Sequence, residues 1–156
     1  MKGNDRIIDT LNALLSDELT AINQYMVHSE MCDDWGYEKL HTAIEKRAID
    51  EMKHAEKLIG RILFLEGRPI VSSLGPITIG AEVDSQLRSD HASELAAVSA
   101  YNNAIRLTVE LGDSGTRELL ESILADEEVH IDWLEAQLDQ IEQMGLPTYL
   151  SKQLPN

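Results

Sequence analysis

The sequence has few of the features that mark disulfide-bonded, nucleic-acid-binding or membrane-spanning proteins. Cys32 is the only cysteine among 156 residues, so an internal disulfide and a four-cysteine metal site are both excluded. Lysine and arginine number 13 against 28 aspartates and glutamates, and the net charge of −15 argues against nucleic acid and anionic membrane as partners. No stretch reaches the roughly eighteen apolar residues of a membrane-spanning helix. The start Met1-Lys2-Gly3 lacks an apolar signal run, so we expect a cytoplasmic protein.

Proline is also scarce, which leaves long stretches that can stay helical. The chain has only four prolines, and apolar residues recur between them at steps of three and four, the period of an amphipathic helix. The length suits one domain with a sizeable core. We therefore predict an all-α fold in a single domain, residues 1–156, with long helices at residues 5–34, 37–66, 83–111 and 115–144 and a short fifth helix at 148–154.

The connections between these helices indicate how they are arranged. Gly36 interrupts the pattern only briefly, so the first two helices should be antiparallel neighbours. Residues 68–81 form the one long connection, and a stretched segment of that length can run the height of a bundle. Such a crossover predicts an up-down-down-up topology, in which two helical hairpins are related by a local two-fold axis.

Two short clusters of charged residues repeat at a spacing of 76 residues. Asp50-Glu51-Met52-Lys53-His54 is followed by Asp126-Glu127-Glu128-Val129-His130, and each places a glutamate and a histidine three apart on one helical face. A lone glutamate lies 33 residues before the glutamate of each pair, Glu18 in the first half and Glu94 in the second. This is the ligand set of helical bundles that bind two iron ions through carboxylates.

All four glutamates lie on the apolar stripes of their helices. Glu18, for example, has Leu11, Leu14, Ile22 and Tyr25 at neighbouring helical positions. A buried, unpaired carboxylate opposes folding by roughly several kcal/mol, and two histidines cannot neutralise four of them. Two divalent cations can, and mixed carboxylate and imidazole ligands favour iron or manganese, with zinc as an alternative. We therefore predict a dinuclear metal site formed by Glu18, Glu51, His54, Glu94, Glu127 and His130.

Two further pairs of residues could support this site. Tyr25 and Tyr101 lie one heptad after the lone glutamates, so they either hydrogen-bond the ligand carboxylates or are core tyrosines with satisfied hydroxyls. Asp50 and Asp126 either orient the histidines of the opposite hairpin, as carboxylates near metal ligands commonly do, or are solvated helix charges.

The chain resembles the bacterioferritin family over nearly its whole length, most clearly in the segments Met1–Gly3, Leu19–Tyr25, Asp50–Ala55, Arg61–Gly67 and Asp126–Glu135. The resemblance implies a ferritin-like four-helix bundle that assembles as a hollow shell of twenty-four copies. It implies that the six residues bind a di-iron pair, with Glu51 and Glu127 bridging. At such a ferroxidase site Fe²⁺ is oxidised to Fe³⁺ by dioxygen or hydrogen peroxide, and the shell stores iron as mineral and so detoxifies it.

The resemblance also concerns Met52, which matches the family's haem ligand. It implies that haem b is held by Met52 from each of two subunits across a two-fold axis, and that a ferredoxin supplies electrons for iron release. Met52 points about 100° away from Glu51 around the helix, so it can face another subunit, and a thioether is a competent iron ligand. From the residues alone, a methionine that fills a helix interface is the preferred interpretation.

The chain departs from the family pattern at three places. Lys46 stands where some members have a histidine that binds iron on the cavity wall, the crossover at residues 68–80 differs in sequence, and Pro147 intrudes at the start of the predicted fifth helix. Four acidic residues either line routes for iron or are solvated helix charges: Asp34, Glu66, Asp132 and Asp139.

Two other functions remain open at this point. A different di-iron enzyme, an oxygenase or peroxidase, would share the ligand set. An oxygenase usually has a longer chain, however, and a rubrerythrin needs a cysteine-rich iron domain that one cysteine cannot make. A metal-free structural bundle would have to bury four glutamates without cations, and the cost of that burial argues against it.

Overall fold

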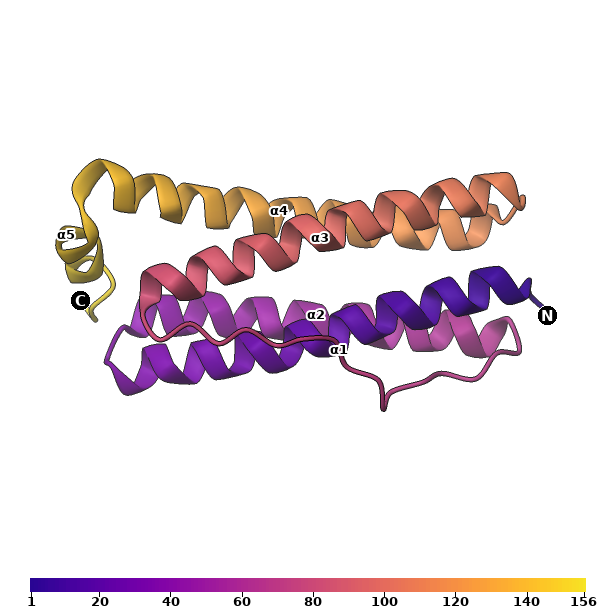
Figure 1. Ribbon diagram of the computed structural model, residues 1–156, viewed down its shortest axis with the longest axis horizontal. Helices are drawn as coiled ribbons and strands as arrows, with labels where there is room; N and C mark the ends of the chain where they lie inside the picture. The colour runs from indigo at the N-terminus through magenta and orange to yellow at the C-terminus, as the bar shows by residue number, and fades with distance from the viewer.

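The computed structural model describes all 156 residues and consists of five helices without any strand. The four long helices are α1 (Asp5–Asp34), α2 (Glu38–Phe64), α3 (Val83–Glu110) and α4 (Ser114–Met144), and a short helix, α5 (Leu146–Ser151), closely follows α4. They form the four-helix bundle with a short C-terminal helix that the sequence predicts (Figure 1). None of the helices is both long enough and apolar enough to span a membrane.

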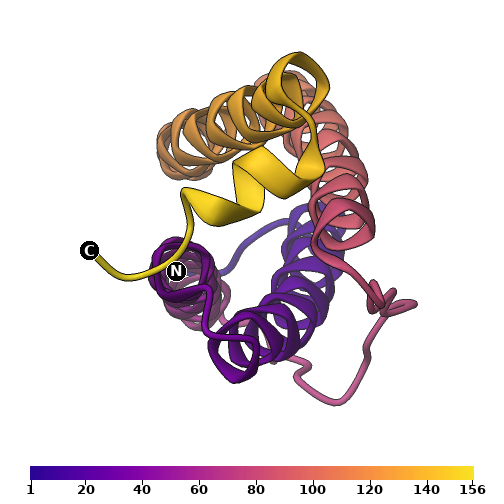
Figure 2. The same ribbon diagram turned by 90° about the vertical axis from the view of Figure 1, so that its left-hand side faces the viewer.

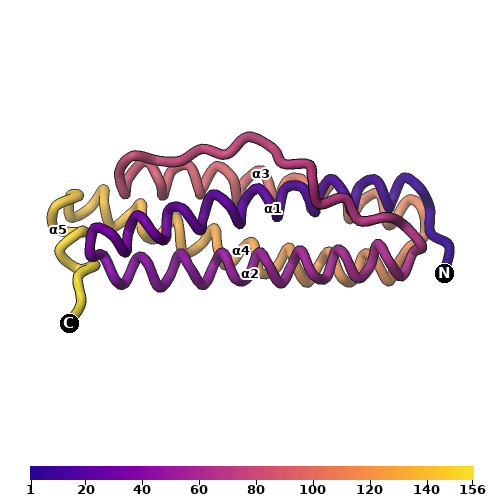
Figure 3. The backbone as a smooth tube through the Cα atoms, turned by 90° about the horizontal axis from the view of Figure 1, so that it is seen from below, coloured from indigo at the N-terminus to yellow at the C-terminus, as the bar shows by residue number.

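The long helices form two antiparallel hairpins, in which α1 pairs with α2 and α3 pairs with α4 (Figure 1). The segment 65–82 runs along the length of the bundle, from the end of α2 back to the start of α3 (Figures 1 and 3). Because of this crossover, α2 and α3 run in the same direction, and the predicted up-down-down-up topology is confirmed.

Side chains on α1 hold the crossover in place through a ladder of hydrogen bonds. Gly75 donates its backbone N–H to Thr20 Oγ1 at 2.8 Å, and Gly80 donates its N–H to His28 Nε2 at 3.0 Å. The ladder repeats every four residues, so successive members lie next to each other in one row along α1. It consists of Asn12, Ser16, Thr20, Gln24 and His28. These side chains satisfy backbone groups of a segment that has no neighbouring strand.

The end of α2 differs from the prediction, since the helix stops at Phe64 and not at residue 66. Glu66 adopts a left-handed conformation with φ 63°, and the N–H of Gly67 reaches back to the carbonyl of Ile62 at 2.9 Å. This pattern closes a helix C-terminus. Gly67 itself is needed for a close approach, because a Cβ there would lie 2.7 Å from Ile8 Cγ2.

The fifth helix also differs from its predicted range of 148–154. α5 begins at Leu146 because Pro147 fits into the first helical turn, where its missing N–H needs no partner. The helix ends at Ser151 because the next two N–H groups bond to carbonyls only three residues back, which tightens the chain into a turn. α5 lies across one end of the bundle and buries Tyr149 (Figure 2).

Two apolar clusters fill the bundle, and a polar layer lies between them. One cluster is built around Leu11, Leu58 and Ile123, toward the end where the chain begins. The other is built around Leu40, Ile44, Leu87, Leu134 and Tyr149, toward the end covered by α5. The four buried glutamates, His54 and His130 fall between these two clusters along the sequence of each helix.

Candidate metal centre

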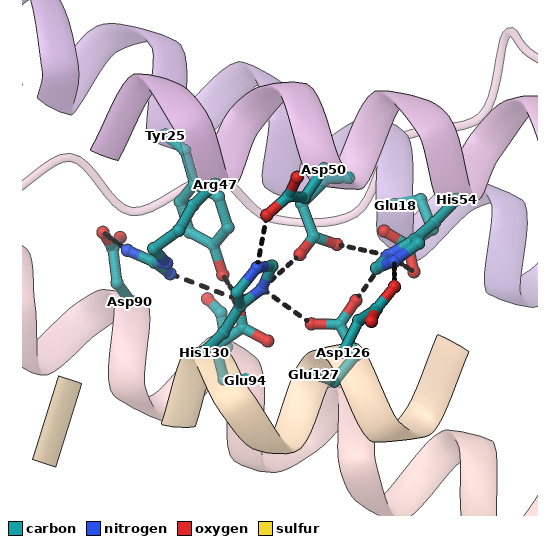
Figure 4. Close-up of polar contacts among 12 residues, drawn as sticks. Glu18, Tyr25, Arg47, Asp50, His54, Asp90, Glu94, Asp126, Glu127 and His130 are labelled. Carbon is teal, nitrogen blue, oxygen red and sulfur yellow. Dashed lines mark hydrogen bonds and ion pairs between the residues drawn. The ribbon is translucent and has the colours of Figure 1, made fainter. Parts of the chain in front are cut away.

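The six predicted ligands meet in the middle of the bundle. All are buried, with exposed fractions of 5% or less. Each long helix contributes: Glu18 comes from α1, Glu51 and His54 from α2, Glu94 from α3, and Glu127 and His130 from α4. All of these except Glu51 are labelled in Figure 4. The structure therefore joins the two halves of the sequence repeat in one place.

The donor atoms form two overlapping groups. One nitrogen or oxygen from each of Glu18, Glu51, His54 and Glu127 lies within 4.8 Å of the others, and the same holds for Glu51, Glu94, Glu127 and His130. Glu51 and Glu127 belong to both groups. The arrangement therefore has places for two cations, with these two carboxylates between them.

Each histidine contacts two acidic residues of the other hairpin. His54 Nε2 lies 2.9 Å from Asp126 Oδ2, and His130 Nε2 lies 3.0 Å from Asp50 Oδ2. An aspartate that accepts a hydrogen bond from Nε2–H keeps the proton on that nitrogen and leaves Nδ1 free as a metal ligand. His54 Nδ1 does point inward, at 2.9 Å from Glu127 Oε1.

His130 Nδ1 also points inward, as His54 Nδ1 does, and lies 2.9 Å from Glu51 Oε1.

The two tyrosines also make contacts between the two hairpins. Tyr25 donates its hydroxyl to Glu94 Oε1 at 2.8 Å, and Tyr101 donates to Glu18 Oε1 at 2.5 Å. Of the alternatives that the sequence left open, the structure therefore has both tyrosines bonded to the lone glutamates.

The centre concentrates buried polar atoms that have no hydrogen-bond partner. Seven buried side-chain atoms lack a hydrogen bond of good geometry, and five belong to the centre: Glu18 Oε2, Glu51 Oε1, Glu94 Oε2, Glu127 Oε2 and His130 Nδ1. Two of these five, His130 Nδ1 and Glu51 Oε1, nevertheless lie 2.9 Å apart as an ion pair. An unsatisfied buried group costs roughly 1–3 kcal/mol, and more when it is charged. Free lone pairs that converge from four helices fit a set of metal ligands, and oxygen and imidazole donors suit iron, manganese and zinc.

Burial and mutual contacts shift the protonation of the centre strongly. Burial, together with the nearby Glu51, holds the pKa of Glu18 well above its usual range. Burial alone would lower the pKa of His130, but the carboxylates of Glu127, Glu51 and Glu94, all within 3.5 Å of its Nδ1, outweigh burial and raise the pKa to about 12.

The pKa of His54 is raised for the same reason, despite its burial, by the nearby carboxylates of Glu127, Glu18 and Glu51. Without metal, both histidines of the centre are therefore protonated to imidazolium. A cation that takes these ligands must displace those protons.

A network of ionic side chains beside Glu94 was not expected from the sequence. Arg47 lies 3.2 Å from Glu94 and 3.3 Å from Asp90, and both Arg47 and Asp90 are buried (Figure 4). The guanidinium also stacks 4.3 Å above the ring of Tyr25. The sequence spacing could have indicated this network, because Arg47 lies four residues before Glu51 and Asp90 lies four before Glu94, on the inward faces of their helices.

A cavity of about 200 Å³ adjoins the centre between α1 and α3. Its wall includes Glu18, Glu51 and Glu94, and the crossover covers it at Gly75 and Pro76. Asp17 also lines this cavity, and burial raises the pKa of its carboxyl group. The cavity gives the otherwise closed centre a space that small ions can occupy.

The remaining candidate residues lie outside the centre. Met52 is 45% exposed on the outer side of α2. Lys46 extends along the same helix to Asp50, with its Nζ 3.1 Å from Asp50 Oδ2. The four acidic residues considered for iron access are all exposed and do not meet in the centre: Asp34, Glu66, Asp132 and Asp139.

The fold and the buried carboxylate and imidazole donors define a class of protein, the four-helix bundles that hold metal ions in their interior. Residues 8–144 match the model of the ferritin family, which describes a ferritin-like domain. The chain is 41% identical to a bacterioferritin from Brucella melitensis, over 96% of this chain and 92% of that protein. It is 42% identical to a bacterioferritin from Rhodobacter capsulatus, over 93% and 90% of the two chains.

A bacterial ferritin from Synechocystis is 43% identical over 99% of both chains. With this degree of similarity over almost the full length, the chain belongs to the bacterioferritins of the ferritin-like family.

Proposed function

We propose that this protein stores iron and detoxifies it by oxidising Fe²⁺ to Fe³⁺ at the buried centre. The observation that carries the proposal is the convergence of buried carboxylate and imidazole donor atoms from four helices into two overlapping groups. The similarity to proteins named bacterioferritin supports the same activity.

In this proposal each ligand has a defined task. Glu18 and His54 hold one ferrous ion, Glu94 and His130 hold the other, and Glu51 and Glu127 lie between them. Each ion gives one electron to an oxidant. Two Fe²⁺ and two protons therefore reduce one H₂O₂ to two waters, or one O₂ to one H₂O₂. Carboxylates are hard ligands and favour the ferric product. The protons that the histidines release on metal binding are available for this reduction.

The activity can be tested by replacing one bridging ligand. Glu127→Ala should abolish the rapid rise of ferric absorbance after Fe²⁺ is added in air, because both cation positions lose a ligand. Glu128→Ala is a matched control, since Glu128 is the next residue on α4 and is exposed. Oxidation by Glu127→Ala at the rate of the unchanged protein would contradict the site assignment.

We further propose that twenty-four copies form a hollow shell, that haem b is bound between two subunits by Met52, and that a ferredoxin reduces the stored iron for release. The exposure of Met52 beside the exposed apolar side chain of Ile49 supports a subunit contact at this face of α2. A shell of 17.4 kDa chains should elute from a sizing column at roughly 400 kDa.

The haem assignment predicts a specific spectral change. Met52→Leu should remove the Soret absorbance, because leucine cannot ligate iron. Oxidation of Fe²⁺ should remain largely intact, since Met52 takes no part in the buried centre. Full haem occupancy in Met52→Leu would rule out this ligand.

A further inference from the structure

The two halves of the centre have matching ligands but different surroundings. A shift of 76 residues relates Glu18 to Glu94, Tyr25 to Tyr101 and each Glu-x-x-His pair to the other. The same shift does not relate the residues around them. The polar residues beside Glu94 correspond to apolar ones beside Glu18: Arg47 to Ile123, Asp90 to Leu14, Gln24 to Ala100 and His28 to Ala104.

The polar residues on the Glu94 side are tightly connected. Asp90 is fully buried and accepts hydrogen bonds from Gln24 Nε2 and Arg47. It also lies 2.9 Å from His28 Nδ1. Because His28 Nε2 accepts the N–H of Gly80, the ring proton sits on Nδ1 and points at Asp90, and His28 is neutral. Arg47 and Asp90 are thus the only charged groups that the network adds to the centre.

The guanidinium of Arg47 lies between Asp90 and the centre (Figure 4). Its positive charge is therefore nearer to the metal ligands than the negative charge of Asp90, and the pair presents its positive side to Glu94. Glu94 Oε1 accepts hydrogen bonds from both Arg47 and Tyr25, so only Oε2 remains without a partner.

On the other side, Glu18 Oε1 accepts a hydrogen bond only from the neutral hydroxyl of Tyr101. The apolar side chains of Leu14 and Ile123 are both buried in the core of that half. A cation beside Glu18 therefore meets a carboxylate group that no guanidinium shares, whereas a cation beside Glu94 meets a carboxylate already hydrogen-bonded to a guanidinium.

We propose that Arg47 makes the cation position at Glu94 and His130 the weaker of the two, so that divalent cations fill the Glu18 and His54 position first. The inference rests on the proposed function, since it concerns the same centre. Because the charged hydrogen bond from Arg47 competes with a cation for Glu94, the affinities should differ by about tenfold or more.

Ordered filling has a consequence for the proposed oxidation. Two electrons leave the centre only when both positions hold Fe²⁺. A protein that carries one ion per subunit should hold it at Glu18 and His54 without reacting quickly. The weaker position would then determine the iron concentration at which oxidation begins.

The order of filling can be measured without oxidation by using Zn²⁺, which has no redox chemistry. Metal-free crystals soaked with about one Zn²⁺ per subunit should show anomalous density mainly at Glu18 and His54. Equal density at both positions, or more at Glu94 and His130, would overturn the inference and leave the proposed function standing. Absence of Zn²⁺ from both positions, even in excess, would overturn the proposed function as well.

The role of Arg47 can be tested by removing the charges of the pair. In Arg47→Met with Asp90→Asn, the new side chains keep similar volume, and an amide oxygen at position 90 can still accept from Gln24 and His28. The two positions should then fill nearly equally. Arg47→Lys keeps the charge and should keep the order.

A preference that stayed unchanged in the double variant would show that Arg47 does not cause it. If that variant fails to fold, as judged by its helical circular dichroism, Arg47→Gln provides a second test, because it removes the charge of Arg47 alone and keeps a donor for Glu94.

Discussion

Asp126 illustrates how much the metal centre depends on single residues that are not ligands themselves. Its carboxylate lies 2.9 Å from His54 Nε2, on the side of the ring that faces away from the centre. A proton held between these two atoms fixes the tautomer of His54 and directs Nδ1 at the metal position. Asp50 does the same for His130 from the opposite hairpin.

Replacing this aspartate should weaken metal binding while the fold is kept. Asp126→Asn removes the negative charge that holds the Nε2 proton, so Zn²⁺ affinity should fall by roughly 10–100-fold. Competition with a coloured chelator would measure the change. Asp132→Asn is a suitable control, because Asp132 is exposed on the same helix. Equal loss in both variants would mean that general surface charge, and not His54, is responsible.

Spacing alone could predict most residues of the centre. A glutamate and histidine three apart share a helix face, and the 76-residue repeat required two such pairs. The Arg47 network could not be predicted in the same way. A buried arginine is stable only if particular partners on other helices meet it, and Asp90 and Glu94 come from α3 while Arg47 is on α2.

At the scale of helices and connections, the end of α2 contains an unusual backbone conformation. The equivalent left-handed positions after α1 and α3 are glycines, Gly36 and Gly112, whereas α2 has Glu66 there. A side chain in this conformation costs roughly 1–2 kcal/mol. Glu66 gains little in return, since its ion pair with the N-terminus is 3.8 Å long and exposed.

Glu66→Gly should therefore stabilise the protein, by up to about 1 kcal/mol. Urea unfolding of the metal-free protein would measure the gain. Glu66→Ala is the matched control, because it removes the same ion pair but keeps the Cβ that causes the strain. A glycine variant no more stable than the alanine variant would contradict this explanation.

The sequence predicted the helices better than their ends. Helical periodicity depends on many residues, so four long helices followed directly from it. The end of α2 depends on one backbone angle at Glu66, and the start of α5 on how Pro147 fits a first turn. The ladder of hydrogen bonds from α1 could not be predicted, because the partners of its polar side chains are known only once the path of the crossover is known.

At the scale of the whole molecule, metal binding and folding are coupled. Cations that bind the folded centre, and not the unfolded chain, add stability in proportion to the logarithm of their concentration, about 2.7 kcal/mol at one hundred times the dissociation constant. Zn²⁺ should therefore raise the melting temperature of the metal-free protein, and a chelator should reverse the effect.

This stabilisation should decrease as pH falls. Protons compete with cations for His54 and His130, whose pKa values the surrounding carboxylates raise. In the metal-free protein, the contribution of the two histidines to stability changes with pH in the opposite direction. Its imidazolium contacts contribute fully below the unfolded pKa of about 6.5, contribute less as pH rises above it, and are lost once pH has passed through the higher folded values.

Scanning calorimetry with and without Zn²⁺, at pH 8 and at pH 5.5, would test both statements. The melting temperature difference should be larger at pH 8. Glu127→Ala, which lacks a ligand of both positions, should show little difference at either pH. A shift of similar size in that variant would indicate that Zn²⁺ stabilises the protein somewhere else.

The ladder between α1 and the crossover sets a limit on how this protein can change during evolution. Its side chains bond to backbone atoms of the crossover, from Arg68 to Gly80, so they are indifferent to most of the residues there. An insertion or deletion of one residue, however, would shift every later hydrogen bond of the ladder out of register and uncover the cavity beneath Gly75 and Pro76. The segment is therefore free to diverge in composition but constrained in length, which is the reverse of what is usual for a surface loop.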